Sequence, residues 1–241
     1  MEVTKMSKFF KSKKIMWIIS IIPLILTGIV IQFMPDSVPM HYDMSGQIDR
    51  WGSKYENIIF PILIILITLF WQIFILYYEK KALTASTDKE RHEAASNAKC
   101  LIIVSISTSI VFGIMQCFIL FGSYFEATKN STHASIDIAK VSCILLGVLY
   151  IILGNYMPKT KKNGTIGVRI SWSMYNDVTW AKSNHFGAIA LIITGLLTII
   201  TSIFVSGNLS TILMLIYLAI AVVAILIYSY DIYRDECKSR H

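Results

Sequence analysis

The chain has 241 residues, of which 55% are apolar and 15% are charged, and its net charge is +7. Ordinary soluble domains carry about 25% charged residues, so this composition excludes a typical soluble globular protein. The apolar residues also occur in long uninterrupted runs, and about 18 or more such residues cross the roughly 30 Å hydrocarbon layer as a helix. The sequence therefore predicts a helical membrane protein.

Six runs are predicted to span the membrane: 15–33, 58–78, 100–121, 141–157, 185–205 and 211–230. The fourth run is the shortest, and we expect Asp137 and Lys140 before it to snorkel toward the interface. The first run follows several lysines but has no small-residue cleavage site, so it is interpreted as an uncleaved signal anchor. The predicted fold class is all-α, a polytopic integral membrane protein with six transmembrane helices.

The basic residues predict the orientation, because cytoplasmic loops of membrane proteins carry an excess of Lys and Arg. With the N-terminus inside, the cytoplasmic pieces hold 18 of the 22 Lys and Arg residues. These pieces are 1–14, 79–99, 158–184 and 231–241. Both termini are therefore predicted to be cytoplasmic. The same distribution attributes the net charge to topology and to contact with anionic lipid, and it disfavours direct nucleic-acid binding.

Several kinds of chemistry are missing from the sequence. The four cysteines form no CxxC pair and none lies in an outside loop, so neither a disulfide nor a zinc or redox site is expected. No HExxH, GxSxG, GxxxxGK[ST] or GxGxxG motif occurs. The spans carry no central Lys or Arg, which counts against a proton pump or coupled carrier. We expect no enzyme activity, no cofactor and no metal.

The first informative segment is the predicted outside loop, residues 34–57. Its prolines and glycines favour a compact structured loop, and its aromatic residues suit the membrane–water boundary. His41, Asp43 and Asp49 have the chemistry of metal ligands. Solvated polar residues are the favoured interpretation, because three such side chains in a short loop are a weak signal.

The second informative segment is the predicted cytoplasmic stretch 154–187. Pro158 ends or kinks a helix, and Asn163-Gly164 indicates a turn. Trp172 and Trp180 are expected to lie in the headgroup layer. Two interpretations remain open: a loop whose Arg169 and lysines meet lipid phosphates, or a specific ligand or partner site.

Both segments resemble known families. The outside loop resembles the bacterial membrane domain of unknown function 1648, which carries a P-x-H-[aromatic]-[N/D]-x-x-G motif after its first span. The matching residues are Pro39, His41, Tyr42, Asp43, Gly46, Asp49, Trp51, Ser53 and Lys54. The cytoplasmic segment is similar to the SdpI family signature at Gly154, Asn155, Lys159, Lys161, Asn163, Ile166, Gly167, Arg169, Trp172, Trp180 and His185. This chain departs from the signature at Ile170-Ser171, where Thr-Pro is usual, and at Asn184, where Thr is usual.

The resemblance implies a function. SdpI-like proteins are bacterial membrane proteins that protect a producing cell from its own secreted killing peptide. By resemblance, this chain is a plasma-membrane immunity protein against a peptide toxin, and further a signal-transducing receptor that sequesters a cytoplasmic repressor. The expected partners are the lipid bilayer, the toxin and the repressor. The implied toxin-facing residues are Pro39, His41, Tyr42, Asp43, Gly46, Asp49 and Trp51, and the implied cytoplasmic residues are Asn155, Asn163, Gly167, Arg169, Trp172, Trp180 and His185.

Two other classes of function are weighed beside immunity. A transporter or channel for a small solute or peptide is one, although the small residues in the spans more often serve close packing (Thr108, Gly113, Gly147, Thr194 and Gly195). A membrane-embedded enzyme using His41, or His185 with Arg169, is less favoured, because His185 is interpreted as a helix-end residue.

The chain divides into four predicted regions. Residues 1–80 form a two-helix membrane domain with its structured loop, and residues 81–137 form a linker and the third span. Residues 138–230 form the SdpI-like membrane domain, and residues 231–241 form a cytoplasmic tail.

Overall fold

The computed structural model describes the backbone of residues 2–239 and the side chains of residues 12–239. The extreme ends of the two predicted tails, residue 1 and residues 240–241, lie outside the described residues. Six long helices make up most of the fold: α1 (Glu2–Val30), α2 (Ile59–Leu83), α3 (Asp88–Lys129), α4 (Ile138–Tyr156), α5 (Asp177–Phe204) and α6 (Gly207–Lys238). A two-stranded sheet, β1 (Ser37–Tyr42) and β2 (Ile48–Ser53), and two 3₁₀ turns, η1 (Lys54–Ile58) and η2 (Met157–Lys159), complete it.

The predicted spans and the predicted fold class are confirmed. Each predicted run lies on one helix to within three residues at its ends, and all six helices are long and apolar enough to cross a membrane. The chain is a multi-pass membrane protein. At about 1.5 Å per residue, the 42 residues of α3 extend roughly 63 Å, about twice the hydrocarbon thickness. The ends of α3 therefore reach beyond the hydrocarbon layer.

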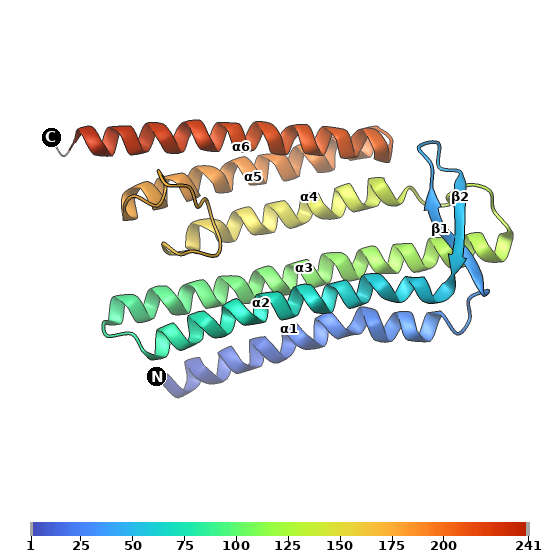
Figure 1. Cartoon of the computed structure of the whole chain (residues 1–241), viewed down its shortest axis with the longest axis horizontal. Helices are drawn as coiled ribbons and strands as arrows, with labels where there is room; N and C mark the ends of the chain where they lie inside the picture. The colour runs from blue at the N-terminus through green and yellow to red at the C-terminus, as the bar shows by residue number, and fades with distance from the viewer. Residues whose placement is uncertain (1, 240–241) are drawn as a thin grey trace.

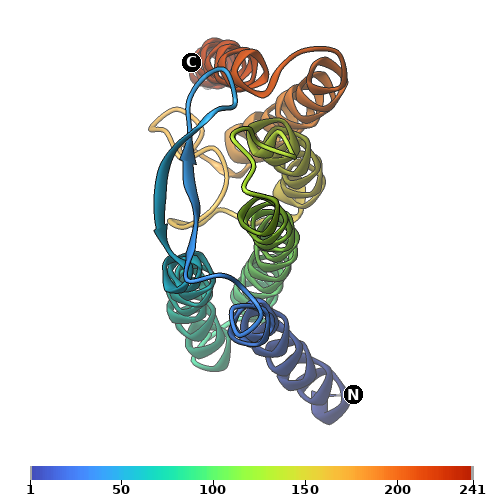
Figure 2. The same cartoon turned by 90° about the vertical axis from the view of Figure 1, so that its right-hand side faces the viewer.

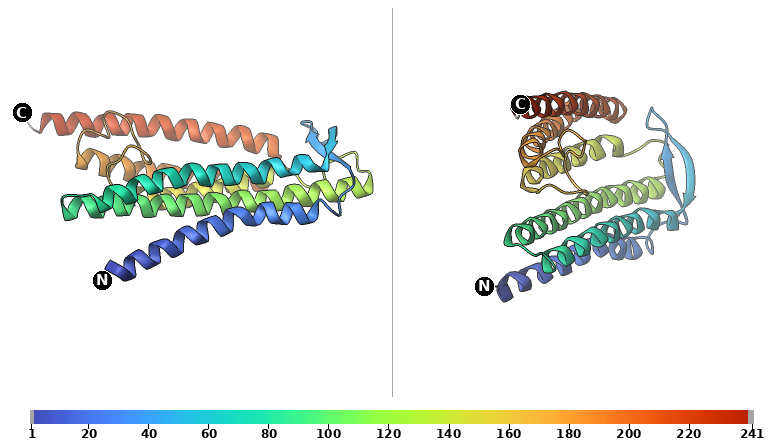
Figure 3. Two further views of the ribbon diagram at one scale, coloured as in Figure 1. Left: turned by 60° about the horizontal axis from the view of Figure 1, so that its bottom comes forward. Right: turned by 60° about the vertical axis from the view of Figure 1, so that its left-hand side comes forward.

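The helices lie side by side in two groups, with α1 and α2 packed on α3, and α5 packed between α4 and α6 (Figure 1). Contacts between α3 and α4 join the groups. The N-terminus of α1 and the C-terminus of α6 lie at one end of the bundle, and the β-hairpin lies at the other (Figures 1 and 3). We refer to these as the terminal end and the hairpin end.

Small residues bring α4 and α5 into close contact. A Cβ atom built on Gly195 would lie 2.5 Å from the carbonyl oxygen of Gly147 on α4. About two helical turns further along α4, a Cβ on Gly154 would lie 2.8 Å from the carbonyl oxygen of Ala188 on α5. Larger residues at these glycines would push the helices apart, so the packing interpretation of Gly147 and Gly195 is confirmed.

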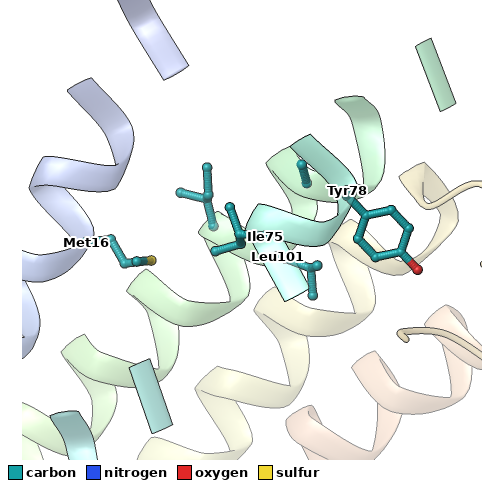
Figure 4. Packing of buried hydrophobic residues seen from close by; sticks show 6 residues of the cluster. Met16, Ile75, Tyr78 and Leu101 are labelled. Carbon is teal, nitrogen blue, oxygen red and sulfur yellow. The ribbon is translucent and has the colours of Figure 1, made fainter. Parts of the chain in front are cut away.

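Two apolar clusters occupy opposite ends of the α1–α3 group. At the terminal end, Met16, Ile75, Tyr78 and Leu101 pack together (Figure 4). At the hairpin end, the buried residues are Ile31, Met34, Val38, Leu120 and Ala127. Because Val38 belongs to β1 and Leu120 to α3, this second cluster packs the hairpin against the helices.

A carboxylate sets the entry into the second helix group. Asp137 Oδ1 accepts from Lys140 N at 2.9 Å and so caps the start of α4, while Asp137 Oδ2 accepts from Gly207 N at 2.8 Å at the start of α6. Negative charge at a helix N-terminus is stabilising, and here one side chain serves two helices. This capping role explains how Asp137 is accommodated beside the shortest span.

Candidate functional site: two loops at opposite ends of the bundle

The predicted compact outside loop forms a β-hairpin, residues 37–53. Its strands pair antiparallel, and its tip is shaped by Asp43, whose Oδ1 accepts from the backbone N of Ser45 and Gln47, each at 2.8 Å. Gly46 adopts φ +80°, a conformation that favours glycine. The Ser45 hydroxyl also donates to Asp43 Oδ1 at 2.7 Å, and this bond, followed by the backbone bonds, holds the pKa of the Asp43 carboxyl below its usual range.

A buried carboxylate attaches the hairpin to α3. Tyr42 donates its hydroxyl hydrogen to Glu126 Oε2 at 2.6 Å, and Glu126 is only 1% exposed. Ser135 N donates to the other oxygen of Glu126, and Ser123 Oγ donates to Pro39 O at 3.4 Å. Burial, together with the carboxylate partner, raises the pKa of Tyr42 far above its usual value of 10, so the hydroxyl remains a donor.

Further backbone contacts hold the hairpin tip. Ile48 N donates to Thr132 O at 2.9 Å, and Ala134 N donates to Gly46 O at 2.8 Å, so the α3–α4 connection runs beside the tip. Asn208 at the start of α6 donates its side-chain NH₂ to Met44 O at 2.8 Å. The hairpin thus reaches across the bundle from the side of α2 to the side of α6 (Figure 2).

Three of the predicted toxin-facing residues line one cleft beneath the hairpin. Pro39, His41 and Tyr42 form one wall of a space of about 300 Å³. The remaining lining comes from Met40 and from the helical side: Asn57, Ile119, Ser123 and Ile138. The cleft therefore lies where the hairpin meets α3 and the start of α4.

The exposed face of the hairpin carries Asp49 and Trp51, and His41 of the cleft wall reaches this face too. His41 Nδ1 and Asp49 Oδ1 lie 2.6 Å apart as a solvent-exposed pair, and Trp51 is 42% exposed. Asp43 is bonded within the tip and does not join this pair. Among the residues whose side chains are described, no three His, Cys, Asp or Glu groups come together in a way that suits a metal ion.

The second site is the signature loop, residues 157–176, at the terminal end. The buried Asn163 organises its first half: Asn163 Oδ1 accepts from the backbone N of Thr165 and Ile166 at 2.7 and 2.9 Å, and Nδ2 donates to Lys161 O at 2.7 Å. Asn163 is thereby a structural residue of the loop, because its amide replaces the backbone pairing that regular secondary structure would supply.

The second half of the signature loop is locked to α5. Gly167 adopts φ +107°, and a Cβ there would collide with Asn184 Oδ1. That oxygen accepts from Val168 N at 2.8 Å, so the departure from the family pattern at Asn184 supplies a contact of its own. Within the loop itself, Ser173 Oγ donates to Val168 O at 2.6 Å.

The expectation that Trp180 lies in the headgroup layer is wrong. Trp180 is 3% exposed, and its Nε1 donates to Thr160 O at 3.1 Å inside the protein. The structural reason is that α5 begins at Asp177, well before the apolar run, so Trp180 lies on the helix face that packs under the loop. For the same reason His185 lies within α5 and is not a helix-end residue.

The signature loop connects both helix groups. Tyr78 of α2 lies within hydrogen-bond distance of Thr165 Oγ1, at 2.9 Å, and Asn97 Oδ1 of α3 accepts from Lys161 N at 2.8 Å. On the other side, the rings of Trp172 and Tyr230 of α6 meet edge-on at 5.0 Å. Asn155, Arg169 and His185 remain exposed, although Arg169 donates to Gly164 O.

The hydrogen bonds identify site residues that the sequence did not indicate. Glu126 lies five residues beyond the predicted third span, and Asn97 lies before it, so the predicted span includes neither. The sequence feature that could have indicated Glu126 is a lone acidic residue close to an apolar run. The structure places both on the same helix, α3. Nothing in the sequence pattern pairs Asn97 with Lys161.

Comparisons with known proteins match the segments that contain the hairpin and most of the signature loop. Residues 159–229 match the model of the SdpI/YfhL protein family, and residues 18–66 match the domain of unknown function DUF1648. Over 230 residues the chain is 25% identical to a protein of Bacillus subtilis (strain 168) described as immunity protein SdpI, covering 95% of this chain and 99% of that protein. No solved structure matches. The predicted family resemblance is confirmed.

Replacing Tyr42 tests the attachment of the hairpin. We expect Tyr42→Phe to lower the free energy of unfolding by about 1–3 kcal/mol, because buried Glu126 loses a donor. Tyr55→Phe, on an exposed ring, is the control and should change little. Because the pKa of Tyr42 is raised in the fold, its contribution is complete below pH 10 and is lost at higher pH. Thermal unfolding in detergent measures this; equal melting temperatures for the two variants would contradict the assignment.

Two glycines of the signature loop provide a matched pair. Gly167→Ala should lower the free energy of unfolding by about 1–3 kcal/mol, because its φ is positive and its Cβ meets Asn184. Gly164→Ala should be neutral or mildly stabilising, since nothing lies within 4 Å of its Cβ. Thermal unfolding of both variants is the measurement. A loss as large in Gly164→Ala would show that the loop is not locked as described.

Proposed function

We propose that this protein is a membrane immunity protein that protects a bacterial cell from a secreted peptide toxin. The observation that carries the proposal is the likeness to an immunity protein over nearly the whole of both chains. The hairpin and the signature loop, which carry the two family motifs, also have well-defined structures. Likeness in fold alone would be weaker support for the immunity function, because one fold hosts many functions and the sites must be examined separately.

The charge distribution supports a definite orientation for this function. Of the 22 Lys and Arg residues, 17 lie in the described parts of the four pieces at the terminal end, which the positive-inside rule assigns to the cytoplasm. The hairpin then faces outward. An immunity protein needs its recognition surface on the side from which a secreted toxin arrives, and the hairpin is on that side.

The hairpin has the features of a peptide-binding surface. The exposed His41–Asp49 pair offers polar contacts, and exposed Trp51 offers a rigid aromatic one. The adjoining cleft of about 300 Å³ can receive a side chain. Aromatic residues beside polar groups are enriched where proteins bind partners. Attachment to Glu126 keeps this surface ordered before the ligand arrives, which lowers the entropic cost of binding.

A second candidate function, signalling to a cytoplasmic repressor, is favoured by the path of α3. Near one end α3 is bonded to the hairpin through Glu126, and near the other it is bonded to the signature loop through Asn97. The exposed Lys161, Lys162 and Arg169 give that loop a basic surface for a partner. Toxin binding outside and repressor binding inside would then act on the same helix.

A survival assay tests immunity. The chain is expressed in a toxin-sensitive strain, which is exposed to the secreted peptides encoded beside this gene. We expect higher survival than with an empty vector. The double variant His41→Ala/Asp49→Ala should lose protection at unchanged membrane abundance, because it removes the exposed polar pair of the hairpin.

The matched control replaces another exposed ion pair at the opposite end, Asp88→Ala/Arg91→Ala, and should retain protection. Unchanged survival with every peptide tested would contradict the immunity proposal. Equal loss in both double variants would instead contradict the role of the hairpin.

A further inference from the structure

A cavity of about 210 Å³ lies beneath the signature loop, where the two helix groups meet. Its wall combines side chains from four helices and the loop, including Trp71 of α2, Val104 of α3, Leu153 of α4, Leu191 of α5 and Ile166 of the loop. No charged side chain lines it. It is separate from the cleft under the hairpin, which lies at the other end of the bundle.

One polar group in this wall has no partner. The indole Nε1 of Trp71 is buried, and no hydrogen-bond acceptor among the described residues reaches it. The other tryptophans with inward indoles are satisfied: Trp17 donates to Gln72 at 3.3 Å, and Trp180 donates to Thr160 O at 3.1 Å. A buried donor without an acceptor is costly. Six buried side-chain atoms of the described residues lack a partner, and only Trp71 Nε1 belongs to a residue that lines this cavity. Trp71 therefore marks a place where an acceptor from outside the chain would be stabilising.

The size and lining of the cavity restrict what supplies that acceptor. An apolar cavity of about 150 Å³ is large enough to bind benzene, and this one is larger. Mostly apolar walls favour a lipophilic body over a polar solute, and the position among membrane-spanning helices favours a molecule dissolved in the bilayer. The unpartnered indole donor favours a carbonyl or ether oxygen on that molecule.

We infer that this cavity binds a ring-sized lipophilic molecule whose oxygen accepts a hydrogen bond from Trp71 Nε1. The site is independent of the proposed immunity function and of the hairpin. Its wall includes Ile166 and Gly167, two positions of the family signature, so the signature loop forms part of the cavity wall. Precise placement of that loop is what a preformed pocket requires.

The test compares two ligands that differ only in their oxygens. The purified full-length protein in detergent is titrated with 2,3-dimethyl-1,4-naphthoquinone and with 2,3-dimethylnaphthalene, and the rise in melting temperature reports binding. We expect the quinone to bind the wild type, and Trp71→Phe to weaken quinone binding about threefold to tenfold, as loss of one neutral hydrogen bond predicts. The hydrocarbon should bind wild type and Trp71→Phe about equally.

Two further variants locate the binding. Val104→Phe places a larger ring in the wall and should abolish the response to both ligands, whereas Ile110→Phe, at an exposed position of α3, should leave it intact. The inference is overturned if the quinone does not stabilise the wild type, if Trp71→Phe binds it equally well, or if Val104→Phe still responds.

The natural source of the oxygen is identified with the same readout. Menaquinone supplies ring carbonyls and diacylglycerol supplies ester carbonyls. Stronger stabilisation by one of them, lost in Val104→Phe, assigns the site to that class. Stabilisation by neither would overturn the inference for natural membrane ligands.

Discussion

The hydrogen bond from Tyr42 to buried Glu126 is the interaction on which the hairpin end depends. A carboxylate that is 1% exposed must be bonded, and here its donors come from the hairpin and from the α3–α4 connection. The requirement fixes where the hairpin sits, beside the cleft that Tyr42 helps to line. At the terminal end Asn97 of the same helix holds the signature loop. The length of α3 allows it to serve both loops.

Because both loops are bonded to α3, this helix could couple toxin binding outside to the cytoplasmic surface, as the proposed receptor role requires. Both loops also contact α6, the hairpin through Asn208 and the signature loop through Tyr230. A toxin would change the cytoplasmic surface only if it bound more tightly to one arrangement of these helices than to another. Immunity by simple capture needs no such change. The two proposed roles therefore make different demands on one fold.

The sequence predicted the features that depend on composition, and it missed those that depend on contacts between distant residues. Run length and apolarity were enough for the six spans, because the bilayer imposes both. Trp180 was misplaced because a Trp near a membrane boundary suits both the headgroup layer and a buried contact, and only the early start of α5 decides between them. The roles of Asn163 and Gly167 as loop-forming residues rest on side-chain hydrogen bonds and a positive φ, which no periodic pattern reveals.

We propose that the hairpin faces outward and that the signature loop faces the cytoplasm. This orientation is tested most directly by single cysteines in a cysteine-free background, Asp49→Cys in the hairpin and Lys162→Cys in the signature loop, both at exposed positions. Intact cells are treated with a membrane-impermeant maleimide. We expect labelling of Asp49→Cys in intact cells, and of Lys162→Cys only after the membrane is opened. The reverse pattern would contradict it.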